Sequence, residues 1–141
     1  MNYPRLIAWA LCLVGIVELL AFGAVVMPYD QMKAMYEWLG RGEMPPGPVF
    51  QSVMRQVSFT YGLHGIAMFL IASDVVRYRP FVLLTAAGYL IAGPTFIAID
   101  SIAGMPALYI AGNGGSCLLV GGVLTALLLA ERSQGQSSIS R

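Results

Sequence analysis

Long apolar runs separated by short polar connections dominate the chain. A transmembrane helix needs about 20 mostly apolar residues, and four stretches have this character. They predict membrane-spanning helices over residues 6–27, 57–76, 81–103 and 112–130. Because short connections favour antiparallel neighbours, the pattern predicts an all-α integral membrane four-helix bundle, forming a single domain over residues 1–132.

The connection between the first two apolar stretches has a different pattern. Over residues 30–39, apolar side chains recur at the i, i+3, i+4 and i+7 spacing of an amphipathic helix. Tyr36 and Trp38 suit a membrane–water interface, which favours a short interfacial helix in this first extracytoplasmic loop. A helix that packs as part of an ordinary loop fits the pattern equally well.

Composition supports a membrane protein and excludes one class of partner. The chain is 57% hydrophobic and 11% charged, with a mean hydropathy of +0.72. Soluble domains carry about 25% charged residues, so this chain has too few charges to cover a water-exposed surface. We therefore expect the lipid bilayer to be a partner. The net charge of +1 gives no electrostatic basis for binding nucleic acid.

The basic residues predict an orientation. Cytoplasmic loops carry an excess of Lys and Arg, which favours both termini in the cytoplasm. A cleaved signal peptide is an alternative for residues 6–27, but the length of that stretch and Glu18 within it favour a retained helix. The polar residues 133–141 predict a disordered tail. In the predicted orientation, the cytoplasmic side would hold five basic residues, Arg5, Arg77, Arg79, Arg132 and Arg141. The outer side would hold three, Lys33, Arg41 and Arg55.

Two ionisable residues fall near the middle of predicted spans. With a rise of about 1.5 Å per residue, Glu18 and His64 both lie within about 3 Å of the bilayer midplane. Consecutive antiparallel helices are usually neighbours, so we expect a Glu18–His64 hydrogen bond. The pair is either a ligand-binding or proton-relay site, or a structural contact that fixes helix register.

Other polar residues extend this picture. Tyr61 lies outward of this depth, toward the outer face, and Tyr89 lies just inside the midplane. Both are candidates for the same ligand-binding or proton-relay site. Arg55 and Asp100 lie roughly 13 to 16 Å outward of the midplane, which predicts an outer ion pair or two separate headgroup contacts.

No cofactor, metal or catalytic residue is expected from the motifs. Cys12 and Cys117 lie in apolar runs without metal-ligand spacing, and His64 alone cannot form a metal or bis-histidine haem site. The chain contains neither a P-loop nor a GxGxxG motif.

Three segments resemble small four-helix bacterial membrane proteins of the DoxX-like type and their uncharacterised relatives. They are "PRLIAWALCLVGIVEL", "YGLHGIAMFLIASDVVRYRP" and "IAIDSIAGMP". The resemblance covers most of the chain between Arg5 and Gly112, and it carries over no catalytic residue. It implies a four-helix bundle in a bacterial cytoplasmic (inner) membrane and a loose association with redox or quinone-linked membrane complexes.

Three functional hypotheses follow. The first is a module that binds a lipophilic small molecule, such as a quinone or isoprenoid, or serves as an accessory subunit of a larger membrane complex. The second is a small proton-coupled carrier that uses Glu18 and His64, which would require a homo-oligomer to enclose a pathway. The third, a lipid-modifying enzyme, has the least support because no second catalytic group is visible beyond Glu18.

Overall fold

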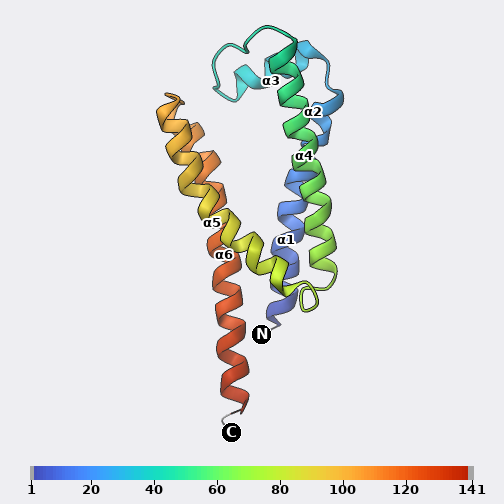
Figure 1. The fold of residues 1–141 in the computed structure, drawn as a ribbon, viewed down its shortest axis with the longest axis vertical. Coiled ribbons are helices and arrows are strands. Elements are labelled where there is room, and N and C mark those ends of the chain that lie inside the picture. The colour runs from blue at the N-terminus through green and yellow to red at the C-terminus, as the bar shows by residue number, and fades with distance from the viewer. Residues whose placement is uncertain (1, 140–141) are drawn as a thin grey trace.

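The computed structural model describes the backbone of residues 2–139 and the side chains of residues 2–134. Every regular element in this range is a helix, as the sequence predicts. In chain order the helices are α1 (Tyr3–Leu19), α2 (Phe22–Val26), α3 (Tyr29–Trp38), α4 (Pro48–Ser73), α5 (Arg79–Ile102) and α6 (Ala107–Ile139) (Figure 1).

Three helical stretches are long and apolar enough to cross a membrane. They are Tyr3–Val26, Arg79–Ile102 and Ala107–Gln134. Large apolar side chains on them point away from the protein, and Leu20 and Leu119 remain 75% and 70% exposed. Exposed apolar surface on this scale is unfavourable in water and is the normal outer surface of a membrane protein.

Helix α4 differs from these three stretches. At 26 residues it is long enough to cross a membrane, but its first half is polar. The helix begins nine residues before the predicted span over residues 57–76 and ends at Ser73. Polar side chains in its first half are Gln51, Ser52, Arg55, Gln56, Ser58 and Thr60.

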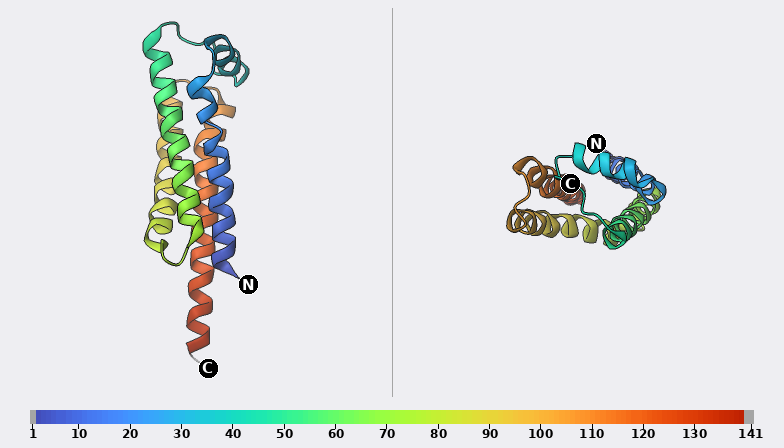
Figure 2. Two further views of the ribbon diagram at one scale, coloured as in Figure 1. Left: turned by 90° about the vertical axis from the view of Figure 1, so that its right-hand side faces the viewer. Right: turned by 90° about the horizontal axis from the view of Figure 1, so that it is seen from above.

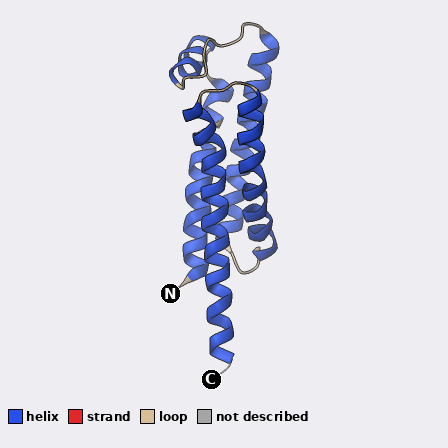
Figure 3. Ribbon diagram, turned by 90° about the vertical axis from the view of Figure 1, so that its left-hand side faces the viewer, coloured by secondary structure: helices blue, strands red, loops and turns tan. Residues whose placement is uncertain are grey.

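The long helices form two antiparallel pairs. Helix α1 packs against α4, and α5 packs against α6. The two pairs meet mainly through α1 and α6, whereas α4 and α5 scarcely touch beyond the turn that connects them. Figure 2 shows these helices running alongside one another, and Figure 3 shows that the loops lie at their ends.

A single hydrophobic core joins the two pairs at one end of the molecule. It contains side chains from all four long helices and from the turn between α4 and α5. Away from this core, α5 and α6 lean away from α1 and α4, toward the end that carries α3 (Figure 1). The buried core residues are Ile7, Leu11, Met68, Ile71, Val75, Val82, Ala86, Leu124 and Leu128.

Small residues explain why each pair packs closely. A Cβ atom added at Gly65 of α4 would lie 2.8 Å from the Gly15 carbonyl oxygen of α1. In the other pair, a Cβ atom at Gly114 would lie 2.8 Å from the Gly93 carbonyl oxygen. Backbones can approach this closely only where both side chains are absent, which is the usual means of packing helices in membranes.

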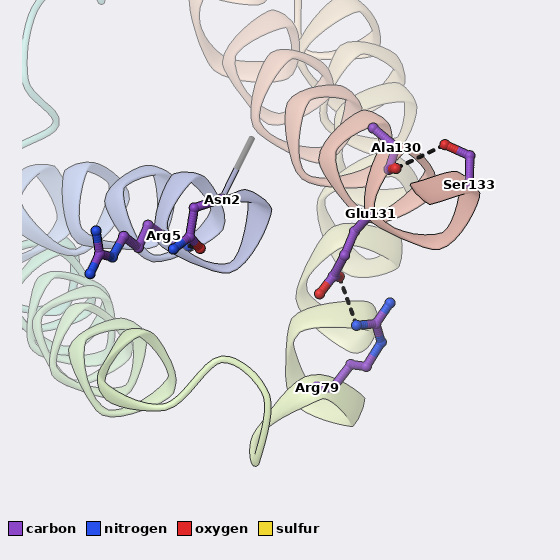
Figure 4. Close-up of polar contacts among 6 residues, drawn as sticks. All are labelled: Asn2, Arg5, Arg79, Ala130, Glu131 and Ser133. Carbon is purple, nitrogen blue, oxygen red and sulfur yellow. Dashed lines mark hydrogen bonds and ion pairs between the residues drawn. The ribbon is translucent and has the colours of Figure 1, made fainter. Parts of the chain in front are cut away.

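Polar contacts at the end of the molecule near the N-terminus cap α1 and join α5 to α6 (Figure 4). Asn2 caps α1 by accepting a hydrogen bond from the Arg5 amide at 3.3 Å. Arg79, the first residue of α5, donates to Glu131 of α6 at 2.7 Å. This ion pair, which the sequence did not predict, fixes the start of α5 against α6.

The last helix is longer than the sequence predicts. Helix α6 continues to Ile139, although the sequence predicts a disordered tail from residue 133. An existing helix extends at the cost of ordering one residue per hydrogen bond, so a polar sequence can continue it. Residues 140 and 141 of the predicted tail lie outside the described residues.

The predicted helix over residues 30–39 is α3. It buries Met32 and leaves Trp38 83% exposed. Gly40 ends it with φ +71°, the left-handed conformation that favours glycine after a helix.

Candidate ligand-binding groove

Glu18 lies in the last turn of α1, directly before a break in the helix. The amide of Ala21 donates to the Glu18 carbonyl oxygen at 3.0 Å, three residues back rather than four. This tighter turn separates α1 from α2. The Glu18 side chain is only 11% exposed, so it lies inside the molecule and must be satisfied there.

Side chains from two other helices satisfy the Glu18 carboxyl group. Its Oε2 lies 2.7 Å from His64 Nδ1 on α4. Its Oε1 accepts a hydrogen bond of 2.6 Å from the Tyr89 hydroxyl on α5. The structure thus joins Glu18 to His64, as predicted, and adds Tyr89 to form a triad.

One nitrogen of His64, Nε2, remains available to hydrogen-bond a ligand. When Glu18 is ionised, both of its oxygens accept, so His64 Nδ1 carries the proton of their shared bond. The other ring nitrogen, Nε2, has no hydrogen-bond partner among the described residues. Because 44% of the His64 side chain is exposed, that nitrogen can meet a molecule from outside.

The glycines on either side of His64 explain how the triad assembles. Gly65 lies against the α1 backbone, where a Cβ atom would be 3.0 Å from the Leu19 amide nitrogen. Gly62 lies against the ring of Phe22, where a Cβ atom would be 2.6 Å from ring carbons. The absence of two side chains therefore brings α1 close enough to α4 for Glu18 to contact His64.

The triad lies in a groove of about 840 Å³ between α4 and α5. Cavities that hold small molecules measure about 300–1,000 Å³ and are mostly apolar with a few polar groups. This groove has the same character. Besides Glu18, His64 and Tyr89, it is lined by Gln56, Val57, Thr60, Tyr61, Ala67, Met68, Ile71, Phe81, Leu84, Thr85, Gly88, Ala92, Phe96 and Cys117.

Tyr61 is the remaining residue predicted for this site. It lines the groove one turn before His64, without a hydrogen bond to the triad. Sequence reasoning missed Thr85 and Cys117, which line the same groove from α5 and α6. A signal for Thr85 is its position one turn before Tyr89, whereas Cys117 lies at the start of an apolar run and carries no comparable signal.

The predicted outer ion pair between Arg55 and Asp100 is not formed. Arg55 Nη2 instead donates to the Met27 carbonyl oxygen at 3.1 Å. Asp100 Oδ2 accepts a hydrogen bond of 2.8 Å from Asn113 Nδ2 on α6. Because α4 and α5 diverge toward this end, residues at the same depth find partners within their own helix pair.

Comparisons with known proteins add no identification. No protein-family model, curated protein or solved structure matches this chain. The resemblance to DoxX-like proteins stays a prediction from the sequence. Among the described residues, no three side chains of His, Cys, Asp or Glu lie together as a potential metal site.

Proposed function

We propose that this chain is a multi-pass membrane protein that binds a lipophilic small molecule in the groove between α4 and α5. The observation that carries the proposal is the position of the Glu18–His64–Tyr89 triad within an apolar groove of about 840 Å³. An apolar cavity with a few convergent polar groups is the usual form of a small-molecule site.

The shape and lining of the groove favour an elongated ligand. Its α4 wall extends from Gln56 to Ile71, which corresponds to about 22 Å of helix. The polar triad lies part-way along this wall, with apolar side chains toward Ile71. A quinone or an isoprenoid alcohol has this form, because each combines an extended hydrocarbon chain with a hydrogen-bonding head.

His64 is the side chain proposed to contact the head of the ligand. Its Nε2 can donate to a carbonyl oxygen or accept from a hydroxyl, depending on its protonation. Glu18, whose other oxygen accepts from Tyr89, would hold the ring through Nδ1, so the orientation of Nε2 is set before the ligand binds.

The proposal includes a full membrane placement as a four-helix bundle. Helix α4 would cross the bilayer with its partner α1, keeping its polar first half near the outer surface. Helix α3 would lie in the outer interface with Trp38 among the headgroups. Both termini would be cytoplasmic in a bacterial inner membrane, as expected for a DoxX-like protein or an accessory subunit of a redox complex.

Ligand-dependent stabilisation tests the proposal. The purified full chain in detergent is heated with decylubiquinone or with geranylgeraniol, and its unfolding midpoint is measured. A ligand at about 100 times its Kd stabilises the folded state by about 2.7 kcal/mol, so a groove ligand raises the midpoint. No rise with either compound would contradict the proposal.

A matched pair of glycine variants locates the binding. Gly88 lines the groove and Gly122 does not, and a Cβ atom at either position meets nothing within 4 Å. We expect Gly88→Leu to abolish the stabilisation and Gly122→Leu to preserve it. Equal stabilisation of both variants would place the ligand elsewhere.

A proton-coupled carrier is the second candidate. It is favoured by the 2.7 Å contact of Glu18 and His64, a possible proton path from the groove into the molecule. In proteoliposomes with an imposed pH gradient, proton flux carried by the wild type and lost in Glu18→Gln would favour this function. Ligand binding without such flux would favour the binding module.

A further inference from the structure

A second cavity lies at the end of the molecule that carries α3, apart from the groove. Its volume is about 630 Å³, and it lies between the loop after α3 and the first turns of α6. We propose that this cavity binds a phosphate group through Arg41. The residues that line this cavity include Trp38, Arg41, Leu108, Tyr109, Gly112 and Ser116.

Arg41 is a cation without an anionic partner. None of the ion pairs or hydrogen bonds among the described side chains involves it, and its Nε is buried without a hydrogen-bond partner. A guanidinium group has five N–H donors in a fixed fork that matches the oxygens of a phosphate. The two terminal nitrogens of Arg41 likewise donate to no described atom and, unlike Nε, are not buried, so they can donate charge-assisted hydrogen bonds to an anion in the cavity.

Two aromatic rings hold the guanidinium in place. The Arg41 Cζ atom lies 4.7 Å from the ring centre of Tyr109 and 5.6 Å from that of Tyr36. These contacts restrict the side chain without using its N–H groups, because a ring face attracts the cation through its π electrons. The fork is therefore positioned before an anion binds.

The wall formed by α6 adds to the positive character of the cavity. Leu108 and Tyr109 belong to the first turn of α6, a helix of 33 residues. The N–H groups at the start of a helix carry partial positive charge. Ser116 adds a hydroxyl group to the lining.

The phosphate has two possible sources. A phospholipid headgroup would place its acyl chains near Trp38 and Leu108, which are 83% and 87% exposed beside the cavity. Free inorganic phosphate would bind from water. The lipid source rests on the membrane placement proposed above, whereas the phosphate chemistry of Arg41 does not.

The test measures both sources on the full chain. Native mass spectrometry of the detergent-solubilised protein compares bound phosphatidylglycerol with phosphatidylcholine, and calorimetry measures inorganic phosphate. We expect Arg41→Gln to weaken binding about tenfold, because it removes charge-assisted hydrogen bonds. Preference for phosphatidylglycerol supports a lipid source, and Arg41-dependent binding of inorganic phosphate alone supports a soluble one.

Two further variants make the test decisive. Arg77 lies at the opposite end with its Cζ 5.6 Å from the Tyr78 ring centre, so Arg77→Gln is a matched control that keeps wild-type binding. Gly112→Leu keeps Arg41 and fills the cavity, where an added Cβ meets nothing within 4 Å, and it should also lose binding. Wild-type binding in Arg41→Gln, or no binding of either phospholipid or phosphate by the unaltered protein, would overturn the proposal.

Discussion

Glu18 shows how one carboxyl group can hold three helices together. Each of its oxygens contacts a side chain from a different helix, at 2.7 Å for His64 and 2.6 Å for Tyr89. Hydrogen bonds between membrane helices contribute about 0.6–2 kcal/mol each. Loss of the carboxyl group should therefore affect stability more than loss of either partner.

Two substitutions of Glu18 should distinguish the stability contributed by its hydrogen bonds from that contributed by its charge. Glu18→Ala leaves the Tyr89 hydroxyl and His64 Nδ1 without partners, and we expect it to lower the free energy of unfolding by about 2–4 kcal/mol. Glu18→Gln keeps a hydrogen-bonding group at both positions and should cost about 1 kcal/mol or less. Unfolding in detergent measures both variants, and equal losses would show that charge governs stability.

Removal of the Tyr89 hydroxyl tests whether the triad acts as one unit. Tyr89→Phe and His64→Gln should each destabilise the protein, and the double variant should depart from the sum by about 0.5–1.5 kcal/mol because both side chains bind one carboxyl group. Tyr78→Phe, outside the groove, is the control. Strict additivity would contradict the shared network.

At the scale of elements, the helix pairs depend on glycines that face backbone rather than side chains. A neighbouring backbone cannot move aside without moving its helix, so an added methyl group separates the pair. The contact of Gly65 with Gly15 is the clearest case, because it also determines the distance between α1 and His64.

Gly65→Ala should weaken the pairing of α1 with α4. The new Cβ would lie 2.8 Å from the Gly15 carbonyl oxygen, and we expect a loss of about 1–3 kcal/mol in the free energy of unfolding. Gly88→Ala is the matched control: its Cβ meets nothing within 4 Å, and alanine should stabilise the helix by about 0.5–1 kcal/mol. Similar losses in both variants would contradict the close-packing argument.

Sequence reasoning predicted the helices and the Glu18–His64 contact because both follow from the number of residues along each helix. Apolar length determines a span, and residue rise determines depth. The Arg55–Asp100 pair was wrong because depth says nothing about lateral separation. That separation depends on which glycines face one another, and it also produces the groove that the sequence did not reveal.

At the scale of the whole molecule, the start of α1, the end of α6 and the turn between α4 and α5 lie at the end opposite α3 (Figure 1). Arg5, Arg79 and Glu131 lie at this same end (Figure 4). Arg5 and Arg79 belong to the basic residues that the sequence assigns to the cytoplasm. Their position at one end is compatible with the predicted orientation.

Cysteine labelling of intact cells tests that orientation. In a background with Cys12→Ser and Cys117→Ser, a membrane-impermeant maleimide should label Glu43→Cys, which lies in the exposed loop after α3. It should label Asn2→Cys only after the cells are ruptured. Labelling of Asn2→Cys in intact cells would contradict the predicted orientation.

The splayed arrangement of α4 and α5 has a consequence for how occupancy should be measured. In the proposed membrane placement the groove would face acyl chains, so a ligand would arrive by two-dimensional diffusion from the bilayer. A lipophile partitions strongly into lipid, and its mole fraction there, rather than its aqueous concentration, determines how many grooves are filled. Diluting the protein with additional lipid at a fixed total amount of ligand should therefore empty the groove, even when the buffer volume is unchanged.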